Sequence, residues 1–82
     1  MGKPDDTLSS LFAEPTRANI AWREIEALFK RYGSVSKGSG SRVRVVINGV
    51  KASFHRPHPR KEAHKPLVRS VRRFLENAGL VP

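Results

Sequence analysis

Two histidines set among basic side chains are the residues of this sequence best suited to chemistry. His55 and His58 lie in the segment 37–62, which holds seven of the 16 Lys and Arg residues and one acid, Glu62. Imidazole takes up and releases a proton near neutral pH. Cleaving an RNA backbone without metal needs a base, an acid and cations beside the charge that develops on phosphorus, and this segment contains all three. The alternative, commoner for any single histidine, is that His55 is an ordinary strand residue and that His58 only hydrogen-bonds a backbone group.

Other kinds of site have less support in the sequence. A third histidine, His64, invites a metal hypothesis, but no fourth ligand is evident and the basic surroundings would repel a divalent ion. The chain has no cysteine, which excludes disulfides, thiolate zinc sites and a cysteine nucleophile, and which is typical of a reducing compartment. It has no carboxylate pair of the glycosidase kind, and its Gly-Ser run at 38–41 precedes a predicted strand rather than a helix. We therefore expect no metal site and no small-molecule cofactor.

The net charge of +9 is concentrated in the second half of the chain. A localised positive field suits a phosphate backbone or an acidic protein surface, whereas the bland alternative is a surface that only keeps the protein in solution. We favour nucleic-acid contact, RNA ahead of DNA. The positions expected to contact RNA are Lys37, Ser41, Arg42, Arg44, Lys51, Arg56, Arg60, Lys61, Lys65, Arg69, Arg72 and Arg73. The longest aliphatic run, residues 45–47, is far too short to cross a membrane, so we expect a cytoplasmic protein without a membrane partner.

Two amphipathic helices are predicted on either side of a region of strands. The segment 19–32 has apolar residues at helical spacing, with Asn19 as a suitable N-cap and Tyr32 as the last position of its core stripe. A second, basic helix is expected over 66–78, ended by Gly79 in a Schellman cap.

The strand region between these helices contains a β-hairpin. Its period is close to 2, and Asn48-Gly49 is the strongest short hairpin signal that a sequence offers. A two-residue loop fixes the register, which pairs Arg42 with His55, Val43 with Phe54, Arg44 with Ser53, Val45 with Ala52, Val46 with Lys51 and Ile47 with Val50. The hairpin should therefore turn one apolar face toward the helices and expose a cationic face that carries an imidazole.

These elements predict a single α+β domain over residues 1–82. A loose N-terminal arm, 1–15, with room for one helical turn, precedes a core over 19–82 with the order α-β-β-β-α. Two helices are expected to cover one side of a three-stranded antiparallel sheet. Double-stranded RNA-binding domains have the same order of elements and dock by shape and phosphate contact, although topology alone says little about function.

From Asn19 to Pro82 the chain resembles the HicA family, small RNA-cleaving toxins of bacterial toxin–antitoxin pairs. The resemblance rests on the order and spacing of short motifs: a first helix that ends in glycine, a Gly-Ser turn, a hairpin, a His-Pro basic loop, and a basic helix that ends in Ala-Gly. In this sequence they are Gly33, Gly40-Ser41, the hairpin 42–55, His58-Pro59 followed by Arg60, Lys61 and Glu62, and Arg69 to Ala78-Gly79. The resemblance implies a fold like that of double-stranded RNA-binding domains, mRNA as substrate and a HicB-type antitoxin as partner.

One position departs from the pattern of that family. Its members typically read Gly-Ser-His at the start of the second strand, and that histidine is essential for cleavage, whereas this chain reads Gly40-Ser41-Arg42. Arginine stays protonated and cannot act as a base near neutral pH. The resemblance therefore leaves two possibilities. Either His55 or His58 has taken over proton transfer beside Arg42, or the protein binds RNA without cutting it.

Overall fold

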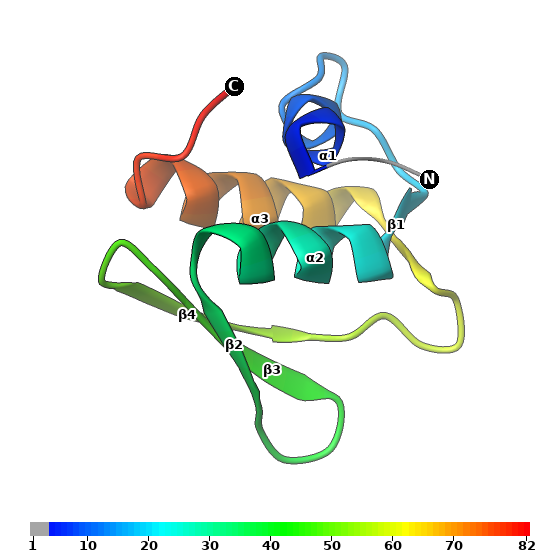
Figure 1. Cartoon of the computed structure of the whole chain (residues 1–82). Coiled ribbons are helices and arrows are strands. Elements are labelled where there is room, and N and C mark those ends of the chain that lie inside the picture. The colour runs from blue at the N-terminus through cyan, green and yellow to red at the C-terminus, as the bar shows by residue number, and fades with distance from the viewer. Residues whose placement is uncertain (1–3) are drawn as a thin grey trace.

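The computed structural model describes residues 4–82, in which helices cover one face of a three-stranded sheet (Figure 1). The elements follow in the order α1 (Pro4–Leu11), β1 (Ile20–Ala21), α2 (Trp22–Tyr32), β2 (Ser34–Lys37), β3 (Arg42–Ile47), β4 (Val50–His55), β5 (Glu62–Ala63) and α3 (Lys65–Asn77). Helices α2 and α3 lie on one face of the antiparallel β2-β3-β4 sheet, and α1 packs on the side of these helices that faces away from the sheet. The expected α+β fold with the order α-β-β-β-α is confirmed.

The hairpin has the register expected from its turn. Strands β3 and β4 pair from Arg42 opposite His55 to Ile47 opposite Val50. Asn48 and Gly49 both have positive φ, 51° and 80°, as the two central residues of a type I′ turn require. Because side chains alternate along a strand, this register turns the apolar set of β3 and β4 toward the helices.

Phe54 on β4 is the point where the sheet meets both covering helices. Its ring centroid lies 5.6 Å from that of Phe29 on α2, 5.7 Å from that of Phe74 on α3 and 6.3 Å from that of Trp22. Aromatic pairs at such separations stabilise a core beyond the area they bury. The packing of Phe54 therefore fixes the end of β4, and with it the position of the next residue, His55.

The end of α3 is closed as the sequence predicts. Gly79 has a φ of 77°, the N–H of Leu80 donates to the Leu75 carbonyl at 2.9 Å, and the Gly79 N–H donates to the Glu76 carbonyl at 3.0 Å. These are the two hydrogen bonds of a Schellman motif, which glycine permits because it adopts positive φ without a steric penalty. The Asn48 amide also donates to the Ala78 carbonyl at 2.8 Å, which attaches the hairpin turn to this helix end.

The expectation of a loose N-terminal arm was wrong for the residues that the structure describes. Residues 4–11 form the helix α1, in which Leu8 and Leu11 are buried in the common core, Leu11 completely. The error has a physical cause: the helical spacing of Leu8, Leu11 and Phe12 extends over only one turn, and the burial of this patch depends on partners that are distant in sequence. Residues 1–3 of the expected arm lie outside the described residues.

The start and the end of α2 also differ from expectation. The helix begins at Trp22 rather than after Asn19, because residues 20–21 form the short strand β1, which pairs with β5. Asn19 has a left-handed φ of 63° and its N–H donates to the Ala63 carbonyl at 3.0 Å, so it is not an N-cap. Tyr32 is 37% exposed, and its hydroxyl donates to Asp5 at 3.0 Å instead of entering the core.

Candidate RNA-binding surface and histidine hollow

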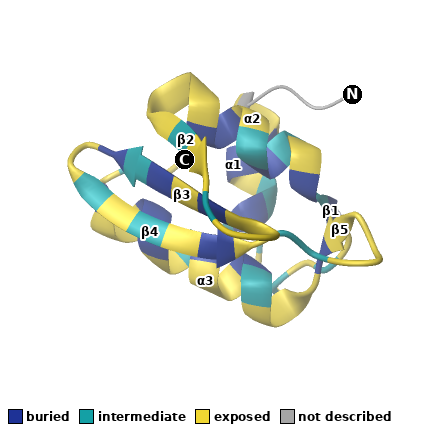
Figure 2. Cartoon of the chain, turned by 90° about the horizontal axis from the view of Figure 1, so that it is seen from below, coloured by how far each residue is buried: buried dark blue, intermediate teal, exposed yellow. Residues whose placement is uncertain are grey.

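The face of the sheet that is turned away from the helices is exposed and basic. Figure 2 looks onto this side and shows exposed positions along β3 and β4. Four of the predicted site residues share this face, since they alternate with the buried set and are exposed: Arg42 and Arg44 on β3, Lys51 and His55 on β4. We call these four residues the outer basic face.

Arg42 and His55 stand directly opposite each other on this face. The Arg56 N–H donates to the Ser41 carbonyl at 2.9 Å, which makes Arg42 and His55 a pair without mutual backbone hydrogen bonds. Side chains approach each other most closely in pairs of this kind. The side chain of Arg42 also lies over Gly38, where an added Cβ would come within 3.3 Å of it. Arg42 and His55 are thus cross-strand neighbours on the outer basic face, at the start of the hairpin.

A second feature begins where β4 ends, an open hollow of about 770 Å³ between β4, the loop after it and α3. All three histidines of the chain contribute to its wall. We call it the histidine hollow, and its wall is formed by Ala18, Asn19, Ser53, Phe54, His55, Arg56, Pro57, His58, Pro59, Arg60, Glu62, His64, Pro66, Leu67 and Ser70. His55 belongs both to this hollow and to the outer basic face.

His64 also lines the histidine hollow, although the sequence did not indicate it as a catalytic candidate. It is the N-cap of α3, and its Nδ1 accepts a hydrogen bond from the Leu67 N–H at 3.1 Å. An imidazole that accepts through Nδ1 carries its proton on Nε2 when neutral, so a donor remains on the other side of the ring. The position before Lys65-Pro66 in the sequence indicated a helix start, but not that this start faces the other two histidines.

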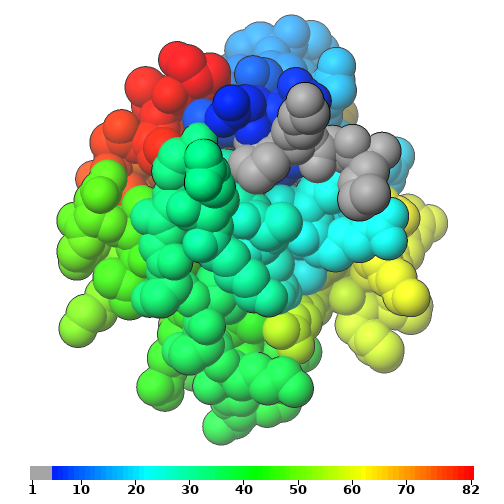
Figure 3. Space-filling view, in the orientation of Figure 1, coloured from blue at the N-terminus to red at the C-terminus, as the bar shows by residue number. Residues whose placement is uncertain are grey.

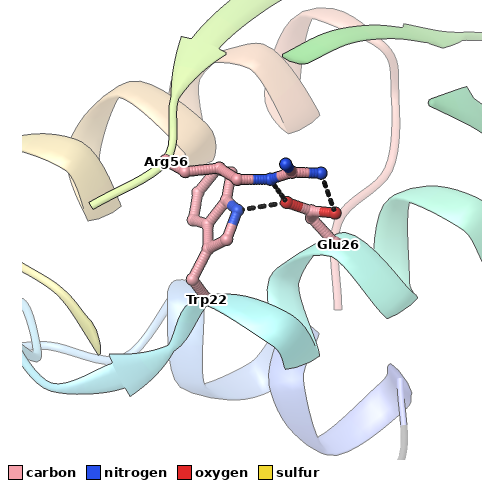
Figure 4. A network of polar contacts seen from close by, with 3 residues as sticks. All are labelled: Trp22, Glu26 and Arg56. Carbon is pink, nitrogen blue, oxygen red and sulfur yellow. Dashed lines mark hydrogen bonds and ion pairs between the residues drawn. The ribbon is translucent and has the colours of Figure 1, made fainter. Parts of the chain in front are cut away.

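The loop that carries His58 is fixed at its start by an ion pair with α2 (Figure 4). Arg56 Nε donates to Glu26 Oε2 at 2.7 Å, Arg56 Nη2 donates to Oε1 at 3.3 Å, and the Trp22 indole N–H donates to Oε2. Burial alone would raise the pKa of the Glu26 carboxyl, but the hydrogen bonds from Arg56 and Trp22 and the charges of Arg56 and Lys30 outweigh it and lower this pKa. The bonds to Glu26 likewise raise the pKa of Arg56.

This ion pair changes the interpretation of Arg56. Its Nε and Nη2 donate to Glu26, so the side chain anchors the loop, although it is 35% exposed and lines the histidine hollow; its contact with RNA stays a prediction. In the space-filling view the loop (yellow) lies at the surface beside the first turn of α2 (cyan), in agreement with this anchoring (Figure 3).

Arg72 is also occupied. Its Nε donates to the Leu11 carbonyl at 2.8 Å, its Nη2 to the Ala13 carbonyl at 3.0 Å, and its Nη1 to Glu14 at 3.0 Å. Its side chain is only 15% exposed. The predicted role of Arg72 as an RNA contact does not fit these partners, because it closes the end of α1 instead.

The remaining predicted cations are exposed but do not all share one face. Lys37 pairs with Val43, whose side chain points to the helix side of the sheet, so Lys37 lies away from the outer basic face. Arg60 belongs to the histidine hollow. The other exposed members of the predicted set are Ser41 in the turn before β3, Lys61 in the loop before β5, and Lys65, Arg69 and Arg73 on α3.

The described part of the chain contains no group of three or more His, Cys, Asp or Glu side chains placed to hold a metal ion. In residues 4–82 no helix has the length and apolar character needed to cross a membrane. The outer basic face and the histidine hollow contain imidazole groups, which can move protons, and guanidinium groups, which can stabilise negative charge on phosphate oxygens.

Comparison with known protein families identifies one match. Residues 22–80 match the family described as the HicA toxin of bacterial toxin–antitoxin systems, a span that runs from the first residue of α2 to Leu80 of the Schellman cap. No curated protein and no solved structure matches the chain significantly. Because the family match covers well over half of the 82 residues, the chain belongs to the HicA toxin family of bacterial toxin–antitoxin systems.

Proposed function

We propose that this protein is a cytoplasmic toxin that binds mRNA on the outer basic face and cleaves it, without metal, at the histidine hollow. Membership of the HicA family supports an RNA substrate and an antitoxin partner. The observation that carries the finer proposal is the position of His55, which stands opposite Arg42 on the sheet and also lines the hollow that contains His58. An RNA strand on the basic face would thus reach two imidazoles and a guanidinium together.

The proposed reaction uses these groups in separate roles. One of the two histidines, His55 or His58, takes the proton from the ribose 2′-hydroxyl, whose oxygen attacks phosphorus. The bond from phosphorus to the 5′-oxygen breaks, and the other histidine, as imidazolium, gives that oxygen a proton. The products are a 2′,3′-cyclic phosphate and a 5′-hydroxyl. Arg42 stabilises the negative charge on the phosphoryl oxygens, because it is permanently charged and can offer two parallel donors.

A second candidate function follows from the same position. Arg42 stands where the family typically has its essential histidine, so the second candidate is an RNA-binding module that has lost cleavage. In that case the outer basic face retains its role and the hollow has no chemical one. The two candidates differ in a single measurement, the integrity of RNA after incubation with purified protein.

The deciding experiment uses antitoxin-free protein, RNA and excess chelator between about pH 5 and 8, the range in which histidine titrates. Cleavage should persist in chelator and fall on the order of 10²-fold in His55→Ala or His58→Ala. Arg42→Lys should keep part of the activity that Arg42→Ala loses, since lysine keeps the charge but not the paired donors. Arg31→Ala, an exposed cation on α2, is the control and should behave as wild type.

The outcomes separate the candidates. RNA that stays intact at every pH excludes cleavage and leaves the binding module. If Arg42→His then creates cleavage, the chain has lost an activity that its relatives keep.

For the partner, we propose a HicB-type antitoxin that covers the outer basic face with acidic or aromatic side chains. It would then compete with RNA for Arg42, Arg44 and His55. Titrating the antitoxin into a complex of protein and labelled RNA should release the RNA. A ternary complex with undiminished RNA affinity would exclude this arrangement.

A further inference from the structure

The histidine hollow does not end at the histidines. A second open hollow, of about 250 Å³, follows β4 toward the Asn48-Gly49 turn and includes Lys51, Arg73 and Asn77. The two hollows share Phe54 and Ser70, one residue from the strand and one from the helix. We therefore propose that they form one continuous track between β4 and α3, and that this track binds single-stranded RNA leading into the histidine hollow; this rests on the RNA-binding function proposed above. We call it the β4–α3 track.

The edge of β4 gives the track a row of hydrogen-bonding groups. Strand β4 pairs only with β3 among the strands that the structure describes, so its other edge has no strand beside it. Because Arg42 and His55 are a pair without mutual backbone bonds, the N–H and C=O groups of His55, Ser53 and Lys51 point away from β3. Figure 2 shows α3 running along this free edge. Ribose and phosphate oxygens can accept hydrogen bonds from such backbone donors.

The composition of the track suits a nucleic-acid single strand. Its floor contains Phe54 and Leu67, which belong to or pack on the core, while Lys51 and Arg73 are exposed at one end and Arg60 at the other. Apolar surface for bases beside cations for phosphates is the usual arrangement in proteins that bind single strands. Strand β4 is about 17 Å long at the usual rise per residue, enough for a few nucleotides.

A duplex would not use these features. In an A-form helix the bases are paired and stacked inside, and proteins contact mainly its phosphates and 2′-hydroxyls across the minor groove. An apolar floor such as that of Phe54 and Leu67 can contact only bases that are unpaired and free to lie against it. The overall likeness to double-stranded RNA-binding domains therefore does not extend to the substrate, and single-stranded RNA should bind better than duplex.

Ser70 is the residue at which the track can be blocked. It is exposed on α3 and lies where the two hollows join, so Ser70→Trp fills the track without disturbing the core. Ser9→Trp is the matched control, because Ser9 is an exposed helical serine on α1 and lines neither hollow. A second pair of variants tests charge: Arg73→Glu in the track against Arg31→Glu on α2, both exposed arginines.

The probe is an unstructured 2′-O-methyl RNA of about 12 nucleotides, within the site sizes of single-strand binders, alone or annealed to its complement. The 2′-O-methyl group removes the nucleophile, so that binding is measured without cleavage. Fluorescence anisotropy with the full chain should show about tenfold weaker single-strand binding in Ser70→Trp and Arg73→Glu than in their controls, and weaker duplex than single-strand binding in wild type.

Two results would overturn the track while leaving RNA binding intact. One is equal affinity of Ser70→Trp and Ser9→Trp, together with equal affinity of the two charge variants. The other is a wild-type protein that binds the duplex as tightly as the single strand. Wild-type protein that binds neither probe at low salt would overturn the proposed function and the track together.

Discussion

The loop 56–61 between β4 and β5, which carries His58 and which we call the histidine loop, is anchored by an ion pair that can be tested by removing one charge. Glu26→Gln keeps the size of the side chain and one carbonyl oxygen. It removes the carboxylate that accepts hydrogen bonds from Arg56 and from the Trp22 indole. We expect the variant to fold, to be less stable, and to hold the loop between His55 and His58 less firmly. The free energy of unfolding is the quantity to measure.

The size of the effect follows from exposure. The Glu26 side chain is 12% exposed and that of Arg56 is 35%, so the pair is neither fully buried nor free in solvent. Hydrogen bonds to charged groups contribute about 1.5–3 kcal/mol when buried, and exposed ion pairs about 0.2–1 kcal/mol. Solvent around Arg56 reduces the first figure, which leaves an expected loss of about 1–2 kcal/mol. In a domain of this size that lowers Tm by roughly 4–16 °C.

The pH dependence has a definite sign. The pKa of Glu26 in the folded protein is lowered from its ordinary value of 4.5, so the folded state binds a proton less readily than the unfolded state. The stabilisation is fully present above about pH 4.5 and is lost as the pH falls through the lower folded pKa. The difference in free energy of unfolding between wild type and Glu26→Gln should therefore be constant from neutral pH down to about pH 4.5. It should become smaller at lower pH.

Trp22 is the only tryptophan and donates to Glu26, so its fluorescence reports both unfolding and the local change. Urea unfolding of both proteins at about pH 7 and at about pH 3.5 should give the difference in free energy of unfolding at each pH. Glu76→Gln, an exposed glutamate on α3, is the control and should match wild type at both pH values. A Glu26→Gln variant as stable as wild type at neutral pH, or a difference that does not become smaller in acid, would refute the reasoning.

Three further predictions concern the surface and the core. RNA affinity should fall with salt at a slope of about −0.7 per phosphate contacted, as counterions are released, and a flat response in a salt titration would remove the electrostatic surface from the proposal. Leu11→Ala should cost about 3 kcal/mol in urea unfolding, because Leu11 is fully buried although it lies outside the family match; a cost near zero would mean that α1 is not part of the core. Gly33→Ala should lower the free energy of unfolding by about 2 kcal/mol or more, because a Cβ there would lie 2.0 Å from the Val46 carbonyl oxygen and 2.7 Å from Ile47 Cγ1. The extended φ of −161° suits any residue, so the effect would come from this clash alone. Unchanged stability would show that the neighbouring strands shift to make room.

Much of the fold was predictable because its determinants are local. Asn48-Gly49 sets the hairpin register within two residues, and Gly79 sets the cap of α3. The segment before α2 was not predictable in the same way. The end of α1 in this segment is held by Arg72, which lies 61 residues from Leu11 along the chain. The local sequence gives no sign of such a pairing.

The candidate site likewise has one part that the sequence predicts and one part that it does not. The neighbourhood of Arg42 and His55 follows from the register alone. The gathering of His58 and His64 at one hollow depends on the path of a loop with two prolines, and that path is set by contacts to α2 and β1. The ion pair of Arg56 was not predictable for the same reason, since nothing in the order of residues indicates that Glu26 lies 2.7 Å from it.

The histidine loop is held at both ends by the segment around the start of α2. At its beginning Arg56 is bound by Glu26, and at its end the Lys61 carbonyl accepts from the Trp22 N–H at 2.8 Å while β5 pairs with β1. Strand β1 lies outside the family match, and Asn19 before it lines the hollow itself. Residues 19–21, which precede the matched span, therefore contribute to the position of the loop that carries His58. A histidine that transfers a proton as proposed needs a position fixed by its surroundings, and around the histidine hollow those surroundings include Asn19 and the pairing of β1 with β5.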